Sequence, residues 1–365
     1  MADKYYRPLK ILFVNNYDMR RAIVEYNQGT YPGHHLWGTL QLPDYGWHVG
    51  TLPFRKLTSE NRLVEKLRRW GTVDQQVMTS LCKNYDVVYS GSLDAVKTLA
   101  IMRAAKLWHR PIVSIVHHPV PDARHHTPKP KQLTGLLEAL VWRLILRGAD
   151  LLVCLSEKVE ESIVKPYPEL RTRTHVVDWG PDLSFYPYVP GKGMWVVSAG
   201  KTHRDYDTLC AALKSVQIPT KIFCSVDCAP QRVVSPWVDV VRGGYKENVV
   251  SYTELRTWYD SAMVIAVPLR EVDGLTGLTS LLDAMAMGKP VIITRNHCLD
   301  IDVEKEGCGL WVEPGDVDGW RSALSYMVEH RSEAEAMGRR GRALCECRYN
   351  IQQFAKQLAG IIKSL

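Results

Sequence analysis

The stretch of sequence that decides the fold is Gly277-Leu278-Thr279-Ser280-Leu281-Leu282-Asp283-Ala284-Met285-Ala286-Met287-Gly288-Lys289-Pro290-Val291-Ile292. It reads as a glycine turn, a short helix, a Gly-Lys-Pro stop and a buried strand. The leucines and Met285 recur at helical spacing, so they predict one buried helix face. Asp283 shares a different face with Thr279, four residues earlier. The stretch therefore predicts a loop-helix-strand unit of an α/β fold.

The start of this helix has the features of an anion site. Gly277 lets a ligand approach the backbone closely, and the N–H groups of Leu278 and Thr279 have no acceptors inside the helix. A carboxylate one turn further along, that of Asp283, can bind ribose hydroxyls. These features outline a site for a nucleotide diphosphate. The alternative is an ordinary loop-helix-strand unit with one solvated aspartate, and this stretch alone does not decide between the two.

Strands and helices alternate through the rest of the chain. We expect strands at residues 11–15, 47–52, 86–90, 112–116, 151–155, 175–177, 195–199, 221–225, 238–241, 264–267 and 291–294. Near-continuous apolar strands that alternate with helices predict parallel sheets covered on both faces. A stretch rich in proline and glycine, 184–193, separates two such series. The sequence therefore predicts an α/β fold with two Rossmann-like, doubly wound domains that face a cleft.

The composition is that of a globular protein with a mild basic excess. The net charge of +7 suits an anionic ligand, an anionic membrane or nucleic acid, although a mildly basic enzyme is the simpler interpretation. The chain has no apolar run of about 18 residues, so no transmembrane helix is expected. Its first ten residues are polar and lack a signal segment. We therefore expect a cytoplasmic protein without a nucleic-acid partner.

The cysteines and histidines do not predict a metal site. Nine cysteines, an odd number, are scattered through expected strands and helices, which favours reduced thiols. The close cysteine pairs, 224 with 228 and 345 with 347, lack a second pair at zinc-site spacing. The doublet His117-His118 is a poor chelate because neighbouring residues on a strand point to opposite faces. We expect no metal ligands.

A second candidate anion site opens the C-terminal half. An expected strand ends there at Gly200, and Lys201 and Arg204 follow before the next helix. Both cations could bind a diphosphate, Arg204 through two parallel hydrogen bonds. A solvated basic loop is the alternative. The position at the carboxyl end of a strand, where such sheets bind ligands, strengthens the anion-site interpretation.

These motifs continue in order along nearly the whole chain. The C-terminal half contains Gly200-Lys201, Arg204-Asp205-Tyr206, Leu209, Gly277 and the run 283–292. The N-terminal half contains IVHHP at 115–119, LSE at 155–157 and WGPDLSFYP at 179–187. Together they resemble the retaining nucleotide-sugar glycosyltransferases with the GT-B fold, family 4 and its near relatives. The resemblance implies an N-terminal acceptor-side domain (1–186), a linker (187–193), a nucleotide-sugar-binding domain (194–345) and a C-terminal helix (346–365) that packs back on the first domain.

The resemblance also implies roles for individual residues around the donor phosphates. Lys201 and Arg204 would neutralise the diphosphate and stabilise it as a leaving group, next to Gly200. Backbone N–H groups at the glycine turn would bind the phosphates, namely those of Gly277, Leu278 and Thr279.

Four further residues would meet other parts of the donor. Asp283 would bind the ribose hydroxyls, where the family usually has glutamate. His117 would contact the donor sugar or support the positive charge that develops at its anomeric carbon. Gly33 would lie beneath the diphosphate, and Tyr245 near the base.

The chain departs from the family pattern at two positions. The family commonly has a glutamate eight residues before the second acid, where this chain has Leu275. Glu271 and Asp273 lie close by, and either could meet the donor sugar. The usual lysine six residues after Gly200 is Tyr206 here.

Two expected helices concern the acceptor. The helix at 133–147 would bury a stripe that includes Leu137 and Leu140 and would leave Trp142, Ile145 and Leu146 off it. Basic residues surround these apolar ones in 129–147 and also in 61–70. Such segments can lie on the inner face of an anionic membrane as a peripheral contact, and packing against neighbouring elements is the alternative. His34 and His35 are further candidates for the acceptor pocket.

The predicted function is retaining transfer of a hexose from a UDP- or GDP-sugar to a hydroxyl acceptor, without a cofactor or metal. The acceptor would be a sugar, a glycan or a lipid-linked molecule. One alternative is a non-catalytic subunit that binds nucleotide sugars or serves as a scaffold, which the missing first glutamate supports. Another is a GT-B nucleotide-sugar epimerase, which would need further acid/base carboxylates in the cleft.

Overall fold

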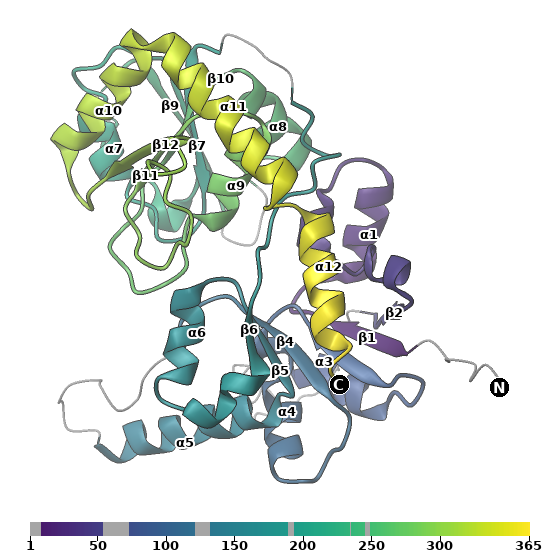
Figure 1. Ribbon diagram of the computed structural model, residues 1–365. Coiled ribbons are helices and arrows are strands. Elements are labelled where there is room, and N and C mark those ends of the chain that lie inside the picture. Colours follow the sequence, from purple (N-terminus) through teal and green to yellow (C-terminus); the bar gives the residue numbers. More distant parts are fainter. Residues whose placement is uncertain (1–8, 54–72, 121–131, 189–192, 234, 245–248) are drawn as a thin grey trace. The chain divides into compact units, whose positions relative to one another are not determined.

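The computed structural model describes residues 9–53, 73–120, 132–188, 193–233, 235–244 and 249–365. The chain forms two compact units (Figure 1). The first comprises Met1–Asn27, His35–Asp178 and Gln352–Leu365. The second comprises Gln28–His34 and Trp179–Ile351. Each unit is therefore assembled from segments that are far apart in the sequence.

The first unit contains a six-stranded sheet with the order β2-β1-β3-β4-β5-β6. All its strand pairs are parallel: β1 (Lys10–Val14), β2 (His48–Thr51), β3 (Val87–Ser90), β4 (Ile112–Val116), β5 (Leu151–Cys154) and β6 (Thr174–Val176). Its helices are α1 (Met19–Asn27), α3 (Val73–Leu81), α4 (Lys97–Ala104), α5 (Gln132–Gly148), α6 (Glu157–Val164) and α12 (Ile351–Ile362). Every residue of β3, β4 and β5 is buried, as expected for a sheet covered on both faces.

The second unit repeats this architecture with the strand order β12-β11-β10-β7-β8-β9. Its parallel strands are β7 (Trp195–Gly200), β8 (Thr220–Ser225), β9 (Val238–Gly243), β10 (Ala262–Val267), β11 (Val291–Thr294) and β12 (Gly309–Val312). Its helices are α7 (Tyr206–Ala212), α8 (Tyr252–Asp260), α9 (Leu278–Ala286), α10 (Val317–Glu329) and α11 (Arg331–Cys347). The predicted α/β fold with two parallel, doubly wound sheets is confirmed.

The sequence analysis missed β12. This strand has only four residues, GLWV, and pairs in parallel with β11 at the edge of the sheet. Its two middle residues are only partly buried at this edge, so pairing with β11 defines the strand.

The prediction for the buried stripe of α5 was wrong. Leu137 and Leu140 are 57% and 52% exposed, whereas Ile145 and Leu146 are buried. The carboxyl-terminal end of α5 packs closely on α4. Gly148 permits this approach, because a side chain at that position would clash with the backbone of Ala100. This approach buries the last turn of α5.

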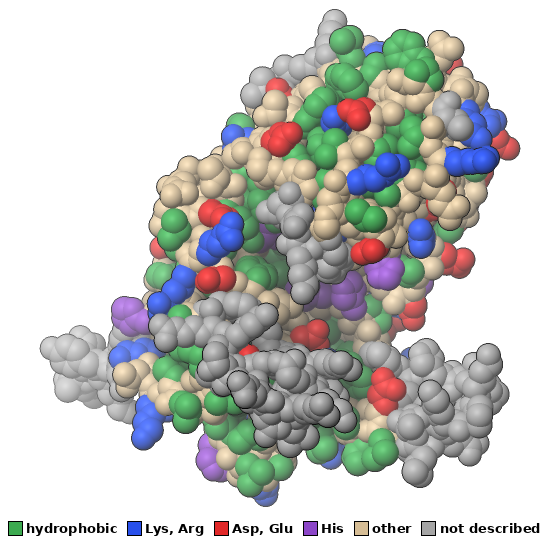
Figure 2. Space-filling model, turned by 180° about the vertical axis from the view of Figure 1, so that it is seen from behind, with side chains coloured by type: hydrophobic (Ala, Val, Ile, Leu, Met, Phe, Trp, Pro, Cys, Tyr) green, Lys and Arg blue, Asp and Glu red, His purple; other side chains and the backbone are tan. Residues whose placement is uncertain are grey.

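Charges of both signs are mixed on the surface that Figure 2 draws, and the cysteines are free thiols. Figure 2 shows Lys and Arg side chains dispersed among Asp and Glu side chains on the face that it draws. The nine cysteines are all free thiols, and seven of them are buried. Among the described residues, no helix is both long and apolar enough to cross a membrane.

Candidate functional site

The loop that follows β7 is held on several sides. The Tyr206 hydroxyl donates to the Gly200 carbonyl (3.1 Å), and the Ser225 hydroxyl donates to the Lys201 carbonyl (2.8 Å). Backbone hydrogen bonds also tie residues 203–205 to residues 268–270, in the loop that follows β10. His203 adopts a left-handed conformation, with a φ of 52°. The loops that follow the neighbouring strands β7 and β10 are thus joined at the carboxyl-terminal ends of these strands.

Arg204 is buried in this loop, with 6% of its surface exposed. Its guanidinium donates to the Thr202 carbonyl (3.0 Å) and to the Ser280 hydroxyl (3.0 Å), while Nε has no hydrogen-bond partner. Gly200 makes room for the guanidinium, because a Cβ atom there would lie 2.3 Å from Nε. Within the described part of the chain, no carboxylate pairs with Arg204. A buried cation of this kind strongly favours the binding of an anion.

Lys201 provides a second cation in the same loop. It is half-buried, and burial lowers the pKa of its ammonium group. Both predicted cations therefore lie in the loop that follows β7, and their contact with a diphosphate remains a prediction.

The amino-terminal turn of α9 lies beside Arg204. Gly277 has a φ of 86° and precedes the helix without a side-chain cap, so the first N–H groups, at Leu278 and Thr279, have no acceptors within the helix. Ser280 joins this turn to the β7 loop, because its hydroxyl accepts from Arg204 and donates to the Ala199 carbonyl (3.2 Å). The structure thus brings the two predicted anion sites together. The sequence analysis missed Ser280, whose position in the first turn of α9 was the available signal.

Asp283 lies within the second unit and is almost fully enclosed, with 4% of its surface exposed. Burial raises the pKa of its carboxyl to about 8, and a hydrogen bond from Tyr186 opposes this shift. Its Oδ1 atom accepts no hydrogen bond and lies 3.5 Å from Nε2 of the buried His34. The carboxyl that was predicted to meet a ribose is therefore covered by side chains in this structure.

Gly33, the predicted neighbour of the diphosphate, belongs to the same buried cluster. Its N–H group donates to a carboxylate oxygen of Asp182 at 3.0 Å. The segment Gln28–His34 contributes to the second unit, although it is remote from that unit in the sequence.

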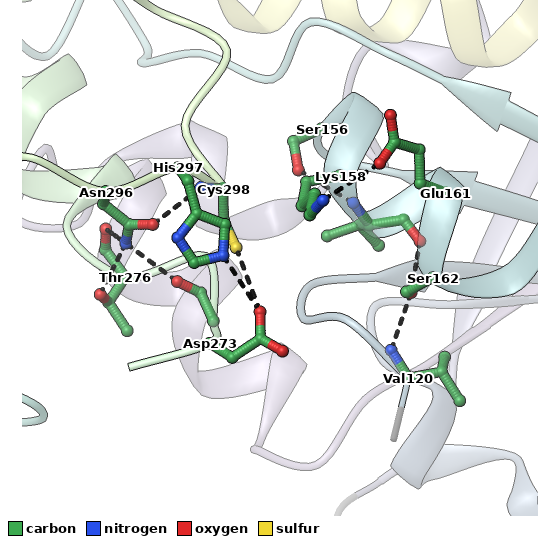
Figure 3. A network of polar contacts seen from close by, with 12 residues as sticks. Val120, Ser156, Lys158, Glu161, Ser162, Asp273, Thr276, Asn296, His297 and Cys298 are labelled. Carbon is green, nitrogen blue, oxygen red and sulfur yellow. Dashed lines mark hydrogen bonds and ion pairs between the residues drawn. The ribbon is translucent and has the colours of Figure 1, made fainter. Parts of the chain in front are cut away.

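The two acids considered for the donor sugar have different surroundings. Asp273 contacts Nε2 of His297 (3.2 Å) and the thiol of Cys298 (3.9 Å), as Figure 3 shows. Asn296 supports the loop by hydrogen bonds to the carbonyl of Gly274 and to Thr276. Glu271 is exposed and makes no hydrogen bond or ion pair within the described residues.

Asp273, His297 and Cys298 together have ligand atoms that could hold a metal ion, all within 4.8 Å of one another. Two of the three are exposed, and no second feature of the described residues points to a metal. Our expectation of no metal site remains a prediction.

The first unit has its own candidate, His117, directly after β4. Its Nε2 atom lies 2.5 Å from the Gly91 carbonyl, which only accepts, so Nε2 carries the proton. The ring packs on Trp37 with 4.7 Å between the ring centroids. Burial lowers the pKa of His117 to about 4, so the ring is neutral at physiological pH.

The remaining predicted features lie elsewhere in the chain or outside the described residues. His35 is in the first unit, and burial lowers its pKa to about 4 as well. Tyr245, predicted to lie near the base, and the segment 61–70 fall outside the described residues, as do residues 129–131. Leu275, where the family has its first glutamate, is buried.

Solved structures of similar fold cover almost the whole chain. Sucrose-phosphate synthase from Thermosynechococcus elongatus matches with a TM-score of 0.69 and 17% identity, over 98% of this chain and 99% of that one. Anabaena HepE in complex with UDP-glucose matches with a TM-score of 0.66 and 15% identity, over 98% and 100%. At these identities the likeness shows the fold.

A curated relative matches part of the chain by sequence. D-inositol 3-phosphate glycosyltransferase from Corynebacterium urealyticum is 33% identical over 113 residues, which are 31% of this chain. The match spans 26% of the length of that relative.

Two family models match different regions of the chain. The Glycosyltransferase Family 4 model matches residues 40–185, and the model for glycosyl transferases group 1 matches residues 234–330. The matched regions contain the motifs at 115–119, 155–157 and 283–292, whereas Gly200, Lys201 and Arg204 lie between the two regions; the fold agrees with this enzyme group. The chain therefore belongs to the retaining glycosyltransferases of family 4 and group 1, with the GT-B fold.

Proposed function

We propose that this protein transfers a hexose from a nucleotide-diphosphate sugar to a hydroxyl acceptor, with retention of configuration. The observation that carries the proposal is the buried guanidinium of Arg204, which has no carboxylate partner in the described part of the chain and lies beside the start of α9. Such a group favours a ligand with concentrated negative charge. A donor diphosphate fits this requirement, and a neutral ligand does not.

We propose UDP as the carrier in preference to GDP. The support is that structures of similar fold, those of Anabaena HepE, were solved in complex with UDP and with UDP-glucose.

The proposed chemistry needs positioning and electrostatic stabilisation more than a protein nucleophile. The bond between the anomeric carbon and the phosphate oxygen breaks first, and Arg204, Lys201 and the N–H groups of α9 stabilise the negative charge on the leaving diphosphate. The acceptor oxygen then bonds to the same face of the anomeric carbon. Its proton passes to an oxygen of the departing phosphate. Because the cations already neutralise the diphosphate, we propose that the reaction needs no metal ion.

We assign the sugar-facing roles to His117 and to one acid of the β10 loop. The neutral ring of His117 can contact a sugar hydroxyl without adding charge. Glu271 is the better of the two acids, because Asp273 already contacts His297 and Cys298.

For the acceptor, we propose a lipid-linked hydroxyl at an anionic membrane surface. The exposed Leu137 and Leu140 of α5 are followed on the same helix by Arg143 and Arg147. A helix with apolar and basic residues on its exposed surface is suited to peripheral membrane contact. Both arginines also pair with Glu169, which weakens their attraction for lipid.

The test begins with nucleotide binding, because a bound ligand raises the melting temperature of the native protein. We expect a clear shift with UDP and UDP-sugars and a smaller one with GDP, ADP and TDP. Incubation with the UDP-sugar that binds should then release free sugar slowly, and NMR should show the retained anomeric configuration. Addition of EDTA should leave both results unchanged.

The alternative scaffold function gives a different pattern. A non-catalytic subunit would bind the nucleotide sugar but would release no sugar, with or without acceptors. The absence of both binding and hydrolysis in folded protein would contradict the proposed function itself.

A further inference from the structure

The segment Gly33–His34, whose histidine covers Asp283, is held by hydrogen bonds with Asp182. Asp182 accepts a hydrogen bond from the N–H group of Gly33 through Oδ2 (3.0 Å), and its own N–H group donates to Nδ1 of His34 (3.2 Å). The other carboxylate oxygen of Asp182 accepts from Ser184. Asp182 therefore holds both the backbone and the ring at this point of the chain.

These contacts decide which nitrogen of His34 carries a proton. A backbone N–H group only donates, so Nδ1 must be the acceptor and has no hydrogen. The proton of the neutral ring is then on Nε2. That atom lies 3.5 Å from Oδ1 of Asp283, close to the carboxyl although the two atoms form no hydrogen bond in the structure.

The carboxyl itself has few other polar neighbours. The groups that face it are Tyr186, between β6 and β7, Tyr259 at the end of α8, and Cys345 on α11. All of these are neutral at physiological pH, and burial raises the pKa of each. His34 thus supplies a polarised donor on the side of Oδ1, which accepts no hydrogen bond in the structure.

We propose that His34 is a positioning residue for Asp283, whose Nε2–H group stabilises the ionised carboxylate that binds the ribose hydroxyls. The inference rests on the proposed function, in which Asp283 meets the nucleotide. Two ribose hydroxyls donate hydrogen bonds, and a carboxylate accepts both, whereas a protonated carboxyl does so poorly. Nucleotide binding therefore selects the ionised form, and a local movement of the covering side chains must admit the ribose.

This arrangement predicts how the affinity for a nucleotide changes with pH. Burial raises the pKa of the Asp283 carboxyl to about 8 in the free protein, so the carboxyl is mostly protonated below that pH. The affinity for a nucleotide should then rise with pH and level off above this value, and binding should release a proton. A weaker donor at position 34 moves the midpoint of this rise to higher pH.

The experiment measures UDP affinity by calorimetry between about pH 6.5 and pH 9, a range in which the raised carboxyl pKa is crossed. Two substitutions separate the hydrogen-bond donor of the His34 ring from its acceptor. His34→Gln keeps an N–H donor near the position of Nε2. His34→Asn keeps an acceptor for the N–H group of Asp182 but has no donor that reaches Asp283.

We expect His34→Gln to bind UDP within about threefold of the wild type, with the same pH midpoint. His34→Asn should bind about tenfold more weakly at pH 7, with a higher midpoint, because the N–H donor beside the ionised carboxylate is lost. Asp283→Asn should remove the rise in affinity with pH. His48→Asn, at an exposed position on the edge strand β2, is the matched control.

Equal losses in both His34 variants, or an unchanged midpoint in His34→Asn, would overturn the inference and leave His34 with a structural role. A pH dependence that survives in Asp283→Asn would also overturn it. These outcomes are distinct from a failure of the proposed function, in which the wild type itself does not bind UDP. Thermal unfolding of each variant at pH 7 shows whether it is folded.

Discussion

The two units have the same sheet but differ in the chemistry of their carboxyl-terminal loops. In the second unit, Arg204 and Lys201 stand at the end of β7 beside the start of α9, so the loops favour negative charge. In the first unit, the residue after β4 is His117, a neutral ring that packs on Trp37. The comparison shows that the fold supplies the position of a site, while the loop residues decide whether it suits a charged phosphate or an uncharged sugar.

The largest effect should come from Arg204→Ala. It removes a buried cation from the leaving group, so kcat/KM should fall about 100-fold or more, as for loss of a preorganised electrostatic donor. Initial rates with the best UDP-sugar check this value. Arg321→Ala, on the exposed surface of α10 in the same unit, should change the rate less than about twofold. Equal effects of the two substitutions would contradict a specific role of Arg204 at the leaving group.

The buried acid and the buried imidazole should respond to pH with opposite signs. The pKa of Asp283 is raised to about 8, so its contribution to stability is present below the unfolded value and is lost as the pH rises toward 8. The pKa of His117 is lowered to about 4, so its contribution is lost as the pH falls from about 6.5.

Asp283→Asn tests the first of these signs. Relative to the wild type, this variant should gain stability between pH 5 and pH 8, by about 1.4 kcal/mol per pH unit at most. Denaturant unfolding at both pH values measures the difference. A variant that parallels the wild type at both pH values would show that the carboxyl is already ionised in the folded protein.

A smaller effect is expected from His117→Ala in the first unit. Turnover should fall about tenfold, because a positioned contact to the sugar is lost, while UDP affinity should stay within about twofold. Steady-state kinetics and calorimetry together separate the two quantities. His109→Ala, at an exposed site after α4, is the control. A parallel loss of UDP affinity would contradict a sugar-specific role for this unit.

The smallest difference should separate the two acids of the β10 loop. Glu271→Gln should lower kcat/KM by about threefold or more, and Asp273→Asn should lower it less, because the Asp273 carboxylate is already occupied by His297 and Cys298. Initial rates measured side by side decide the order. The reverse order would assign the donor sugar to Asp273.

Much of the candidate anion site of the second unit could be predicted from the sequence. The end of a strand at Gly200, the cations after it and the glycine before α9 are local features, and each was in the expected position. What could not be predicted was the use of Ser280 and Gly200 to seat the guanidinium of Arg204. That arrangement depends on two loops that follow different strands.

The sequence by itself determined the two parallel sheets, the helix boundaries around α9 and the presence of cations at the end of β7. These features depend on periodicity and turn residues within a few positions of one another. Only the tertiary structure decided that His34 covers Asp283, that Asp182 orients His34, and that the last turn of α5 is buried. The physical reason is that hydrophobic spacing shows which face of an element is buried, whereas the segment that covers this face comes from a distant part of the chain.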